Sequence, residues 1–249
     1  MPTNRKWLPL AKPPELTTDV VHAWAVRLGV SEQAYECLLA TLAPEEHKRA
    51  AEFHFDEPRR RFVIARGTLR RLLGEYLDLH PMKIGLAVDQ NQKPCLASGH
   101  AGVDLHFNVS HSGDLAVIGF VRGCEIGIDV EHLRDVGYLE QIARRFFHPA
   151  EMSAVLSTPG PIRTLAFLRC WTGKEAILKA LGTGIVGNLA NFQVPIDNGW
   201  QGWVECSTGL SDGRQSRCWL ELLTPSDDYV AAVACVESIR AVHSYTFET

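Results

Sequence analysis

Two carboxylates placed two residues apart are the first feature of this sequence that could do chemistry. Asp129 and Glu131 stand in the run IGIDVEH, whose alternation is typical of a β-strand. Residues two apart in a strand point to the same side, so both carboxylates aim at one place while Val130 faces the core. Paired carboxylate oxygens suit a hard divalent cation, although a D-x-E pair at a strand end is also common as plain solvated charge.

A third carboxylate and two lysines lie in the run WTGKEAILKALGTG, which has the pattern of a helix. Trp171, Glu175 and Lys179 are spaced four residues apart and share one helix face, with Lys174 beside them. An acid and a base four apart also form ordinary exposed helix pairs. If it faces the two strand carboxylates, Glu175 completes a magnesium site that leaves positions open for phosphate oxygens.

A serine and a histidine stand together in HFNVSHSGD, about twenty residues before the carboxylate pair. We expect Ser110 and His111 between a strand and a glycine turn, where backbone N–H groups and small side chains approach a ligand closely. A histidine in a turn can also be purely structural. Its place beside a serine and ahead of the carboxylates makes the pair a candidate phosphate contact.

Helical and strand-like segments alternate twice along the chain and must position these residues. Helices are predicted over TLAPEEHKRAAEF, with Thr41 as the cap, and from Pro58 onward. Short strands joined by tight turns follow from about residue 83 to 130. Helices return in YLEQIARRFF, HPAEMSAVLS and PIRTLAFLRCWTGKEAILKAL, the last ended by Gly182 and Gly184. The runs NFQVPI, WQGWVEC, RCWLELL, YVAAVAC and AVHSYTF are again typical of strands.

This order predicts an α+β protein of two similar lobes, residues 1–123 and 124–249, joined near Gly123. A net charge of −4 favours neither nucleic acid nor an anionic membrane as a partner. The opening MPTNRKWLPLAKPPEL lacks the apolar run of a signal peptide, and no stretch approaches the ~20 apolar residues of a membrane span. We therefore expect a cytoplasmic protein. The seven cysteines include no C-x-x-C pair, which argues against a disulfide framework and a structural zinc site.

Five short motifs in this order resemble the 4'-phosphopantetheinyl transferase superfamily, specifically its Sfp-type branch. They are NQKP (91–94), FNVSHSG (107–113), IGIDVE (126–131), RFF (145–147) and W-x-x-K-E-A-x-x-K (171–179). The match covers roughly residues 44 to 184. The resemblance implies two α/β lobes related by a pseudo-twofold axis, with coenzyme A and Mg²⁺ in the cleft between them.

The resemblance also assigns roles to residues of this sequence. The implied Mg²⁺ ligands are Asp129, Glu131 and Glu175. The implied coenzyme A contacts are Ser110 and His111 at the phosphates, Lys93 and Pro94 in the nucleotide pocket, Arg49 at the 3'-phosphate, and Lys174 and Lys179 from the helical motif. The implied catalytic residues are Glu175, Lys179 and His111.

Two positions depart from the family pattern. Gln92 stands where relatives often have glycine, which puts the local backbone at the adenine pocket in question. Glu46 stands where some relatives have a second basic residue for the 3'-phosphate. Lys48 and Arg61 are the candidate substitutes for that missing charge.

The implied reaction moves the 4'-phosphopantetheine arm of coenzyme A to a serine of an apo acyl or peptidyl carrier protein, releasing adenosine 3',5'-bisphosphate. This is the holo-[acyl-carrier-protein] synthase type of reaction, used in fatty-acid, polyketide and nonribosomal peptide biosynthesis. Mg²⁺ and Lys179 would offset the charge on the pyrophosphate, and Glu175 would take the serine proton. A cleft shared by two lobes of one chain implies a monomer.

Two other function classes stay open at this point. A binding module would hold coenzyme A or a carrier protein without chemistry, and a metal-dependent phosphoesterase would release phosphopantetheine to water. The sequence has no G-x-x-x-x-G-K-[ST] segment and no strand-linked G-x-G-x-x-G, which argues against a nucleoside triphosphatase or a dehydrogenase.

Overall fold

The computed structural model describes residues 6–100, 102–182, 189–206 and 216–248. Its helices are α1 (Glu32–Leu39), α2 (Pro44–Ala51), α3 (Asp56–Leu77), α4 (Leu139–Phe146), α5 (Pro149–Ser157) and α6 (Gly160–Leu181). Its strands are β1 (Leu8–Leu10), β2 (Val20–Arg27), β3 (Leu86–Val88), β4 (Pro94–Leu96), β5 (His106–Ser112), β6 (Leu115–Val121), β7 (Ile126–His132), β8 (Gln201–Cys206), β9 (Ser216–Ser226), β10 (Tyr229–Cys235) and β11 (Ala241–Phe247).

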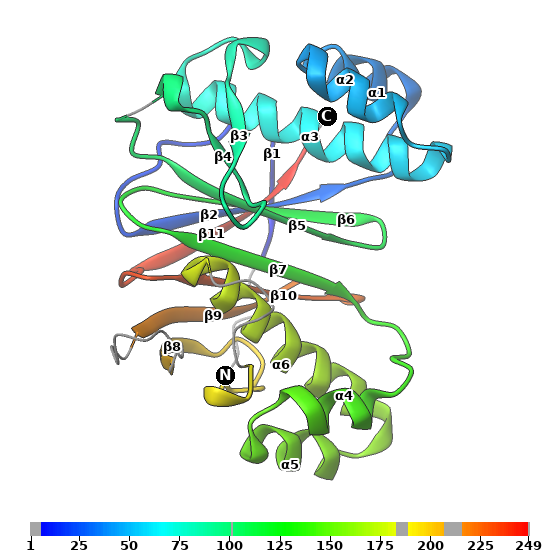
Figure 1. Cartoon of the computed structure of the whole chain (residues 1–249), viewed down its shortest axis with the longest axis vertical. Coiled ribbons are helices and arrows are strands. Elements are labelled where there is room, and N and C mark those ends of the chain that lie inside the picture. Colours follow the sequence, from blue (N-terminus) through cyan, green and yellow to red (C-terminus); the bar gives the residue numbers. More distant parts are fainter. Residues whose placement is uncertain (1–5, 101, 183–188, 207–215, 249) are drawn as a thin grey trace.

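Two sheets pack face to face between two long helices (Figure 1). The first sheet has the strand order β1-β11-β2-β6-β5, and the second has the order β7-β10-β9-β8. Helix α3 covers the outer face of the first sheet, and α6 covers the outer face of the second. The mixed α and β architecture predicted from the sequence is confirmed. The boundary between residues 123 and 124 and the pseudo-twofold axis stay predictions.

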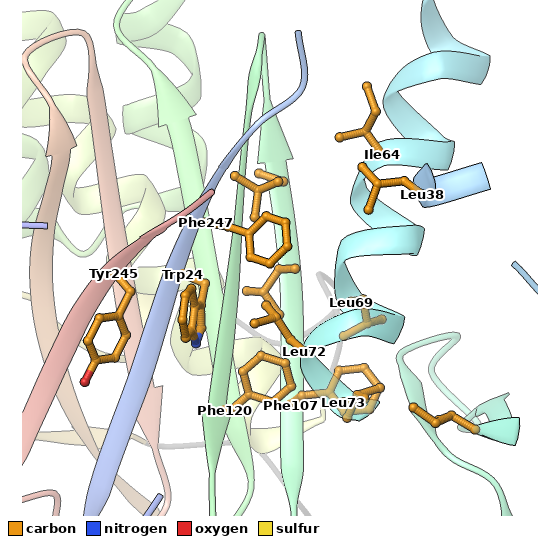
Figure 2. Packing of buried hydrophobic residues seen from close by; sticks show 14 of the residues in the cluster. Trp24, Leu38, Ile64, Leu69, Leu72, Leu73, Phe107, Phe120, Tyr245 and Phe247 are labelled. Atoms are coloured by element: carbon orange, nitrogen blue, oxygen red, sulfur yellow. The ribbon is translucent and has the colours of Figure 1, made fainter. Parts of the chain in front are cut away.

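Three apolar cores follow from strand alternation. In β2, Trp24 and Val26 enter the core beneath α3, whereas Ala23 and Ala25 enter the core between the sheets. Figure 2 shows the first of these cores, in which side chains of the sheet meet those of the helices: Trp24, Phe107, Phe120 and Phe247 on one side, and Leu38, Ile64, Leu69, Leu72 and Leu73 on the other. Strands that are buried on both faces read as continuous apolar runs, which explains LAVIGFV and YVAAVAC.

The N-terminal forty residues hold more structure than the sequence indicated. Strands β1 and β2 and helix α1 were not predicted. The run VVHAWAVR, which forms β2, is buried on both faces and therefore shows no alternation. Thr41 is not the cap of α2: its hydroxyl donates to the carbonyl of Leu38 at the end of α1, and the cap residue is Ala43. The backbone N–H of Ala43 instead donates to Glu46 Oε2 at 2.9 Å.

On the C-terminal side, one predicted strand is not formed, and one predicted helix end is confirmed. The run NFQVPI is not a strand, since residues 189–191 form a 3₁₀ turn and 193–196 join no sheet. Helix α6 ends at Gly182, whose φ of 64° is the left-handed conformation predicted for a glycine cap. Gly184 lies outside the described residues.

All seven cysteines have free thiols, and five are buried, whereas Cys37 is exposed and Cys95 is partly buried. In the part of the chain that the structure describes, no helix has the length and apolar character required to cross a bilayer.

A buried histidine in the first sheet gives a pH-dependent stability. His22 is 1% exposed, and its Nδ1 lies 2.8 Å from the hydroxyl of Tyr76, which also accepts a hydrogen bond from Trp24. Burial, and after it the charge of nearby His243, lower the pKa of His22 to about 4. The folded state therefore stays neutral at this ring while the unfolded chain, with a pKa near 6.5, takes up a proton.

We expect the free energy of unfolding to fall as the pH drops from about 6.5 to 4, by up to about 1.4 kcal/mol per pH unit from this group alone. Urea titrations across that range should show a shallower fall for His22→Asn than for the wild type. Parallel curves for the two proteins would show that His22 does not titrate as described.

Candidate active site

The candidate site lies where one edge of the first sheet meets one edge of the second. Strands β5 and β7 are these edges, and side chains of β5 bridge them. Asn108 Oδ1 accepts a hydrogen bond from the N–H of Ile128 at 2.8 Å, and Ser110 Oγ donates to Asp129 Oδ1 at 2.9 Å. Because alternate residues of a strand share a face, one side of β5 supplies a row of polar groups to β7.

Helix α6 supplies the cation next to Asp129. The ammonium of Lys179 donates to Asp129 Oδ1 at 2.7 Å, to the carbonyl of Ile128 at 3.0 Å and to Ser110 Oγ at 3.2 Å. The helix comes this close because β7 has glycine at position 127. A Cβ at Gly127 would lie 2.0 Å from the carbonyl oxygen of Ala176, on α6.

Glu131 lies two residues along the same strand, as predicted, with Val130 buried between the sheets. Its Oε2 accepts a hydrogen bond from Ser112 at 2.8 Å, and the same hydroxyl accepts one from the N–H of His132. Desolvation raises the pKa of Glu131, and the charge of Asp129 raises it further, against the hydrogen bond from Ser112. Electrostatic repulsion from Asp129 therefore disfavours the charged form of Glu131.

Two carboxylate oxygens of the site are buried without a hydrogen-bond partner among the described residues. They are Asp129 Oδ2 and Glu175 Oε1. Burial raises the pKa of Asp129, whose ion pair with Lys179 opposes the shift. Burial also raises the pKa of Glu175, and the charges of Asp129 and Glu131 add to that effect, while Lys179 opposes it. Three acidic groups and one ammonium thus leave excess negative charge with unpaired oxygens, an environment that favours a bound cation.

The donor set fits a hard divalent cation in chemistry, since carboxylate oxygens are its preferred ligands. As the side chains stand, no three His, Cys, Asp or Glu residues within the described ranges are grouped closely enough to hold a metal ion. The ammonium of Lys179 instead contacts one oxygen of Asp129. Glu175 would complete the set from α6.

Ser110 and His111 lie inside strand β5, which continues to Ser112, and not between a strand and a glycine turn as we expected. Neighbouring strand residues point to opposite faces, so Ser110 faces Asp129 while His111 points to the other side and is exposed. Partial desolvation of the ring by the surrounding protein lowers the pKa of His111, and the charges of Lys179 and Arg61 lower it further. His111 therefore lies near Lys179 and Arg61, on the opposite face of β5 from Asp129.

Lys174 has a structural position, which corrects its assignment as a coenzyme A contact. Its side chain is fully buried, and its ammonium contacts Glu151 Oε2 at 2.8 Å and donates to the carbonyls of Leu189 and Phe192 at 2.6 Å each. Glu151 Oε1 in turn accepts from the N–H of Val194 at 2.6 Å. Although Lys174 is adjacent to Glu175 in the sequence, its side chain points away from the site. It links α6 to Glu151 on α5 and to the carbonyls of Leu189 and Phe192 in the segment after α6.

The NQKP turn rests on the C-terminal end of α6. Lys93 Nζ donates to Glu125 Oε2 and to the carbonyl of Ile126, both at 2.8 Å, and to the carbonyl of Lys179 at 3.4 Å. Asn91 Nδ2 donates to the carbonyl of Gly182 at 2.5 Å. The turn therefore satisfies carbonyls that a helix end leaves free, and it connects the predicted nucleotide pocket, with Pro94 at the start of β4, to the helix that carries Lys179.

Gln92 adopts the left-handed backbone conformation, which glycine adopts more readily than other residues. Its φ is 64°, and the turn is held by Asp89 Oδ1, which accepts from the N–H groups of Asn91 at 2.8 Å and Lys93 at 2.9 Å. The backbone thus takes the left-handed conformation although the side chain is not glycine, at a cost of roughly 1 kcal/mol.

We expect Gln92→Gly to raise the free energy of unfolding by up to about 1 kcal/mol, because relief of the left-handed strain exceeds the added chain entropy. Urea denaturation measures the change. Gln90→Gly is the matched control in the same turn and should lower stability, since the φ of Gln90 is not positive. A loss of stability in Gln92→Gly would contradict this account.

Sequence reasoning missed several polar partners of the site. Asn108 and Ser112 were not singled out, although they flank Ser110 at a spacing of two in HFNVSHS and could have been found by that period. Glu125 was also missed. Hydrogen bonds from His106 and then Lys93 outweigh its burial and hold its pKa at about 2. These partners come from strand edges and turns whose meeting the sequence does not show.

Comparison with known proteins supplies the family. A family model described as the 4'-phosphopantetheinyl transferase superfamily matches residues 125–234, and one described as the N-terminal part of a 4'-phosphopantetheinyl transferase matches residues 29–120. The 4'-phosphopantetheinyl transferase HetI of Nostoc sp. is 39% identical over 231 residues, which cover 92% of each chain. This chain belongs to the 4'-phosphopantetheinyl transferase superfamily.

Two further known proteins are less similar to this chain. The 4'-phosphopantetheinyl transferase Sfp of Bacillus subtilis is 27% identical to this transferase over 204 residues, which cover 82% of this chain and 86% of its own. A solved holo-[acyl-carrier-protein] synthase of Thermotoga maritima covers 45% of this chain and 61% of its own at 21% identity, with a TM-score of 0.29. The two matched family segments lie on either side of the turn between β6 and β7.

Proposed function

We propose that this transferase moves the 4'-phosphopantetheine arm of coenzyme A to a serine of an apo carrier protein with the help of Mg²⁺. The observation that carries the proposal is the pair of buried, unpartnered oxygens on Asp129 and Glu175 beside the ammonium of Lys179. Such a site has unmet negative charge for a cation and a positive group for phosphate. Asp129, Glu131 and Glu175 would hold the Mg²⁺, whose chemistry is to offset charge on the pyrophosphate.

The residues of the chain would act on both partners of the reaction. Glu175 takes the proton of the serine hydroxyl, directly or through water. The serine oxygen then bonds to the β-phosphorus, and the bond from that phosphorus to the bridging oxygen breaks. Adenosine 3',5'-bisphosphate leaves with the bond electrons. Lys179, whose side chain is 30% exposed, offsets the developing charge.

The remaining ligand contacts follow the same proposal. Ser110 contacts a phosphate of coenzyme A from the face that carries Asp129, and His111 approaches a phosphate from the opposite face of β5. The backbone of Lys93 and Pro94 lines the nucleotide pocket, because the Lys93 ammonium is already bound to Glu125. A cytoplasmic location, a monomeric state and activity of the holo-[acyl-carrier-protein] synthase type belong to the proposal as well.

The proposal is tested by mixing the protein with coenzyme A, Mg²⁺ and a panel of apo acyl and peptidyl carrier proteins, and measuring intact masses. We expect at least one carrier to gain the phosphopantetheine mass, and the gain to vanish with EDTA and return with Mg²⁺. A binding module would leave every carrier unmodified, and a phosphoesterase would release phosphopantetheine without a carrier. Either result would reject the transferase assignment proposed here.

A further inference from the structure

One face of β5 carries three small polar residues that reach across to β7. They are Asn108, Ser110 and Ser112, which are spaced two apart. Each is hydrogen bonded to a group of β7, although the two strands belong to different sheets. Figure 1 shows the two strands side by side. Side chains of β5 therefore join the two sheets at the edge where the carboxylates lie.

The hydroxyl of Ser112, at the end of this row, makes two hydrogen bonds. Its oxygen accepts the backbone N–H of His132 at 3.1 Å, and its proton is donated to Oε2 of Glu131 at 2.8 Å. Because the carboxylate of Glu131 has no proton to give, the direction of both hydrogen bonds is fixed. Ser112 is therefore a committed donor to Glu131.

Glu131 has few other contacts that could hold its side chain. It is partly exposed, and within the described ranges of the chain only Ser112 donates a hydrogen bond to its carboxylate. Asp129, by contrast, is 6% exposed and is bound by Ser110 and Lys179. The negative charge of Asp129 also repels Glu131. Without the hydrogen bond, the Glu131 side chain would regain its rotamer freedom and turn away from the like charge.

The two-residue turn that follows Ser112 is anchored by β10 and α3. The N–H of Asp114 donates to the hydroxyl of Tyr229 at 3.1 Å, and the carboxylate of Asp114 accepts from Arg61 Nη2 at 2.7 Å. Gly113, with a φ of 55°, lies so close to Tyr229 that a Cβ would be 2.8 Å from the phenolic oxygen. Ser112 is thus presented by a turn that is itself held in place, as a group that orients a ligand must be.

We propose that Ser112 is a positioning residue of the transfer reaction, which holds Glu131 by Oε2 and leaves Oε1 to bind the Mg²⁺ beside Asp129. This role rests on the proposed function, which supplies the cation. Groups that orient metal ligands contribute to metal affinity, and their removal typically weakens binding by roughly 10–100-fold. Ser112 touches no reacting atom in this role and acts through Glu131.

The test titrates the protein with Mn²⁺, a paramagnetic substitute for Mg²⁺, in the presence of coenzyme A. Electron paramagnetic resonance measures the free ion, and a titration of coenzyme A alone serves as the blank. We expect Ser112→Ala to raise the dissociation constant of Mn²⁺ about tenfold or more. The Mg²⁺ concentration that gives half-maximal transfer to a carrier should rise by a similar factor.

A double-mutant cycle with Glu131→Gln shows whether Ser112 acts through Glu131. Glu131→Gln should itself weaken Mn²⁺ binding, because one anionic ligand is lost. In that background, Ser112→Ala should change the dissociation constant by less than about twofold, since the group that it positions is no longer a carboxylate. A general loosening of the sheet edge would instead weaken Mn²⁺ binding by the same factor in both backgrounds.

Three further variants make the test selective. Ser112→Thr retains the hydroxyl and should bind Mn²⁺ within about threefold of the wild type, whereas Ser112→Cys fills the same space with a weak donor and should bind about as weakly as Ser112→Ala. This pair carries the test if Ser112→Ala does not fold or if Glu131→Gln binds too weakly to titrate. Ser244→Ala is the matched control, a buried serine of β11 that β2 and β6 separate from β5, and it should bind Mn²⁺ as the wild type does.

Several results would overturn this role for Ser112. These are an unchanged Mn²⁺ dissociation constant in Ser112→Ala, equal losses in the two backgrounds of the cycle, an equal loss in Ser244→Ala, or, should the other pair carry the test, equal binding by Ser112→Thr and Ser112→Cys. A wild type that binds no Mn²⁺ above the blank would reject the proposed Mg²⁺ dependence together with this role. Transfer to a carrier and Mn²⁺ binding by the wild type, with unchanged binding in the Ser112 variants, would reject this role alone.

Discussion

Glu175→Gln will remove nearly all transfer to a carrier protein, by on the order of a thousandfold or more, and the protein will remain folded. The substitution keeps the shape of the side chain but removes both the base and one anionic ligand. Because burial and neighbouring charges raise the pKa of Glu175, the wild type loses stability as the pH rises through that pKa. The amide does not titrate, so Glu175→Gln should be as stable as the wild type or more so at neutral pH.

Two measurements check this result. Transfer is followed by intact mass, and the melting temperature is recorded with and without Mg²⁺, which should stabilise the wild type and leave Glu175→Gln unchanged. Glu140→Gln is the control, since Glu140 lies on the exposed side of α4. Near-normal turnover in Glu175→Gln would show that Glu175 is not part of the active site. An equal change of melting temperature with Mg²⁺ in both proteins would show that Glu175 is not a Mg²⁺ ligand.

Gly127→Ala will destabilise the protein by about 3 kcal/mol or more and will also lower its activity. The added Cβ would meet the carbonyl oxygen of Ala176 at 2.0 Å and the nitrogen of Ala180 at 2.4 Å, and backbone atoms of a packed helix cannot rotate aside. Helix α6 must move away from β7. That shift carries Lys179 away from Asp129, so stability and transfer should fall together.

The control for this substitution is on the helix itself. A Cβ at Gly173 would meet only side-chain atoms, the nearest being Val194 Cγ2 at 3.4 Å, and alanine is the better helix former by about 1 kcal/mol. Gly173→Ala should therefore be neutral or stabilising. Urea denaturation compares both variants with the wild type, and a Gly127→Ala protein of normal stability would contradict the close contact of strand and helix.

The sequence predicted the strand side of the site better than the helix side. A period of two is enough to place Asp129 and Glu131 on one face of β7, since the neighbouring Val130 is apolar. A helix has no such simple alternation. Lys174 and Glu175 are adjacent and both are buried, so only contacts with other segments decide which of them belongs to the site. For Lys174 one such contact is the carbonyl of Phe192, which lies beyond the helix.

The missing parts of the prediction have a common cause. Arg66 reads as one of several arginines on the outer face of a helix, and only the packing of α2 against α3 brings it to Glu46 and Arg49. Strand β2 was missed because burial on both faces erases its period. Contacts between segments distant in sequence decide each of these cases, and a local pattern carries no information about them.

The position of β11 has a consequence for how the chain reaches its native state. Residues 241–247 lie between β1 and β2 in the first sheet, with β2 paired in parallel from Ala241↔Val20 to Thr246↔Ala25. During synthesis the first sheet therefore cannot be completed before residues 241–247 have left the ribosome, and until then β2 has an unpaired edge. Such long-range pairing slows folding. Deletion of β11 (residues 241–247) should therefore destabilise the first sheet, and a fragment ending near residue 123 should be prone to aggregation.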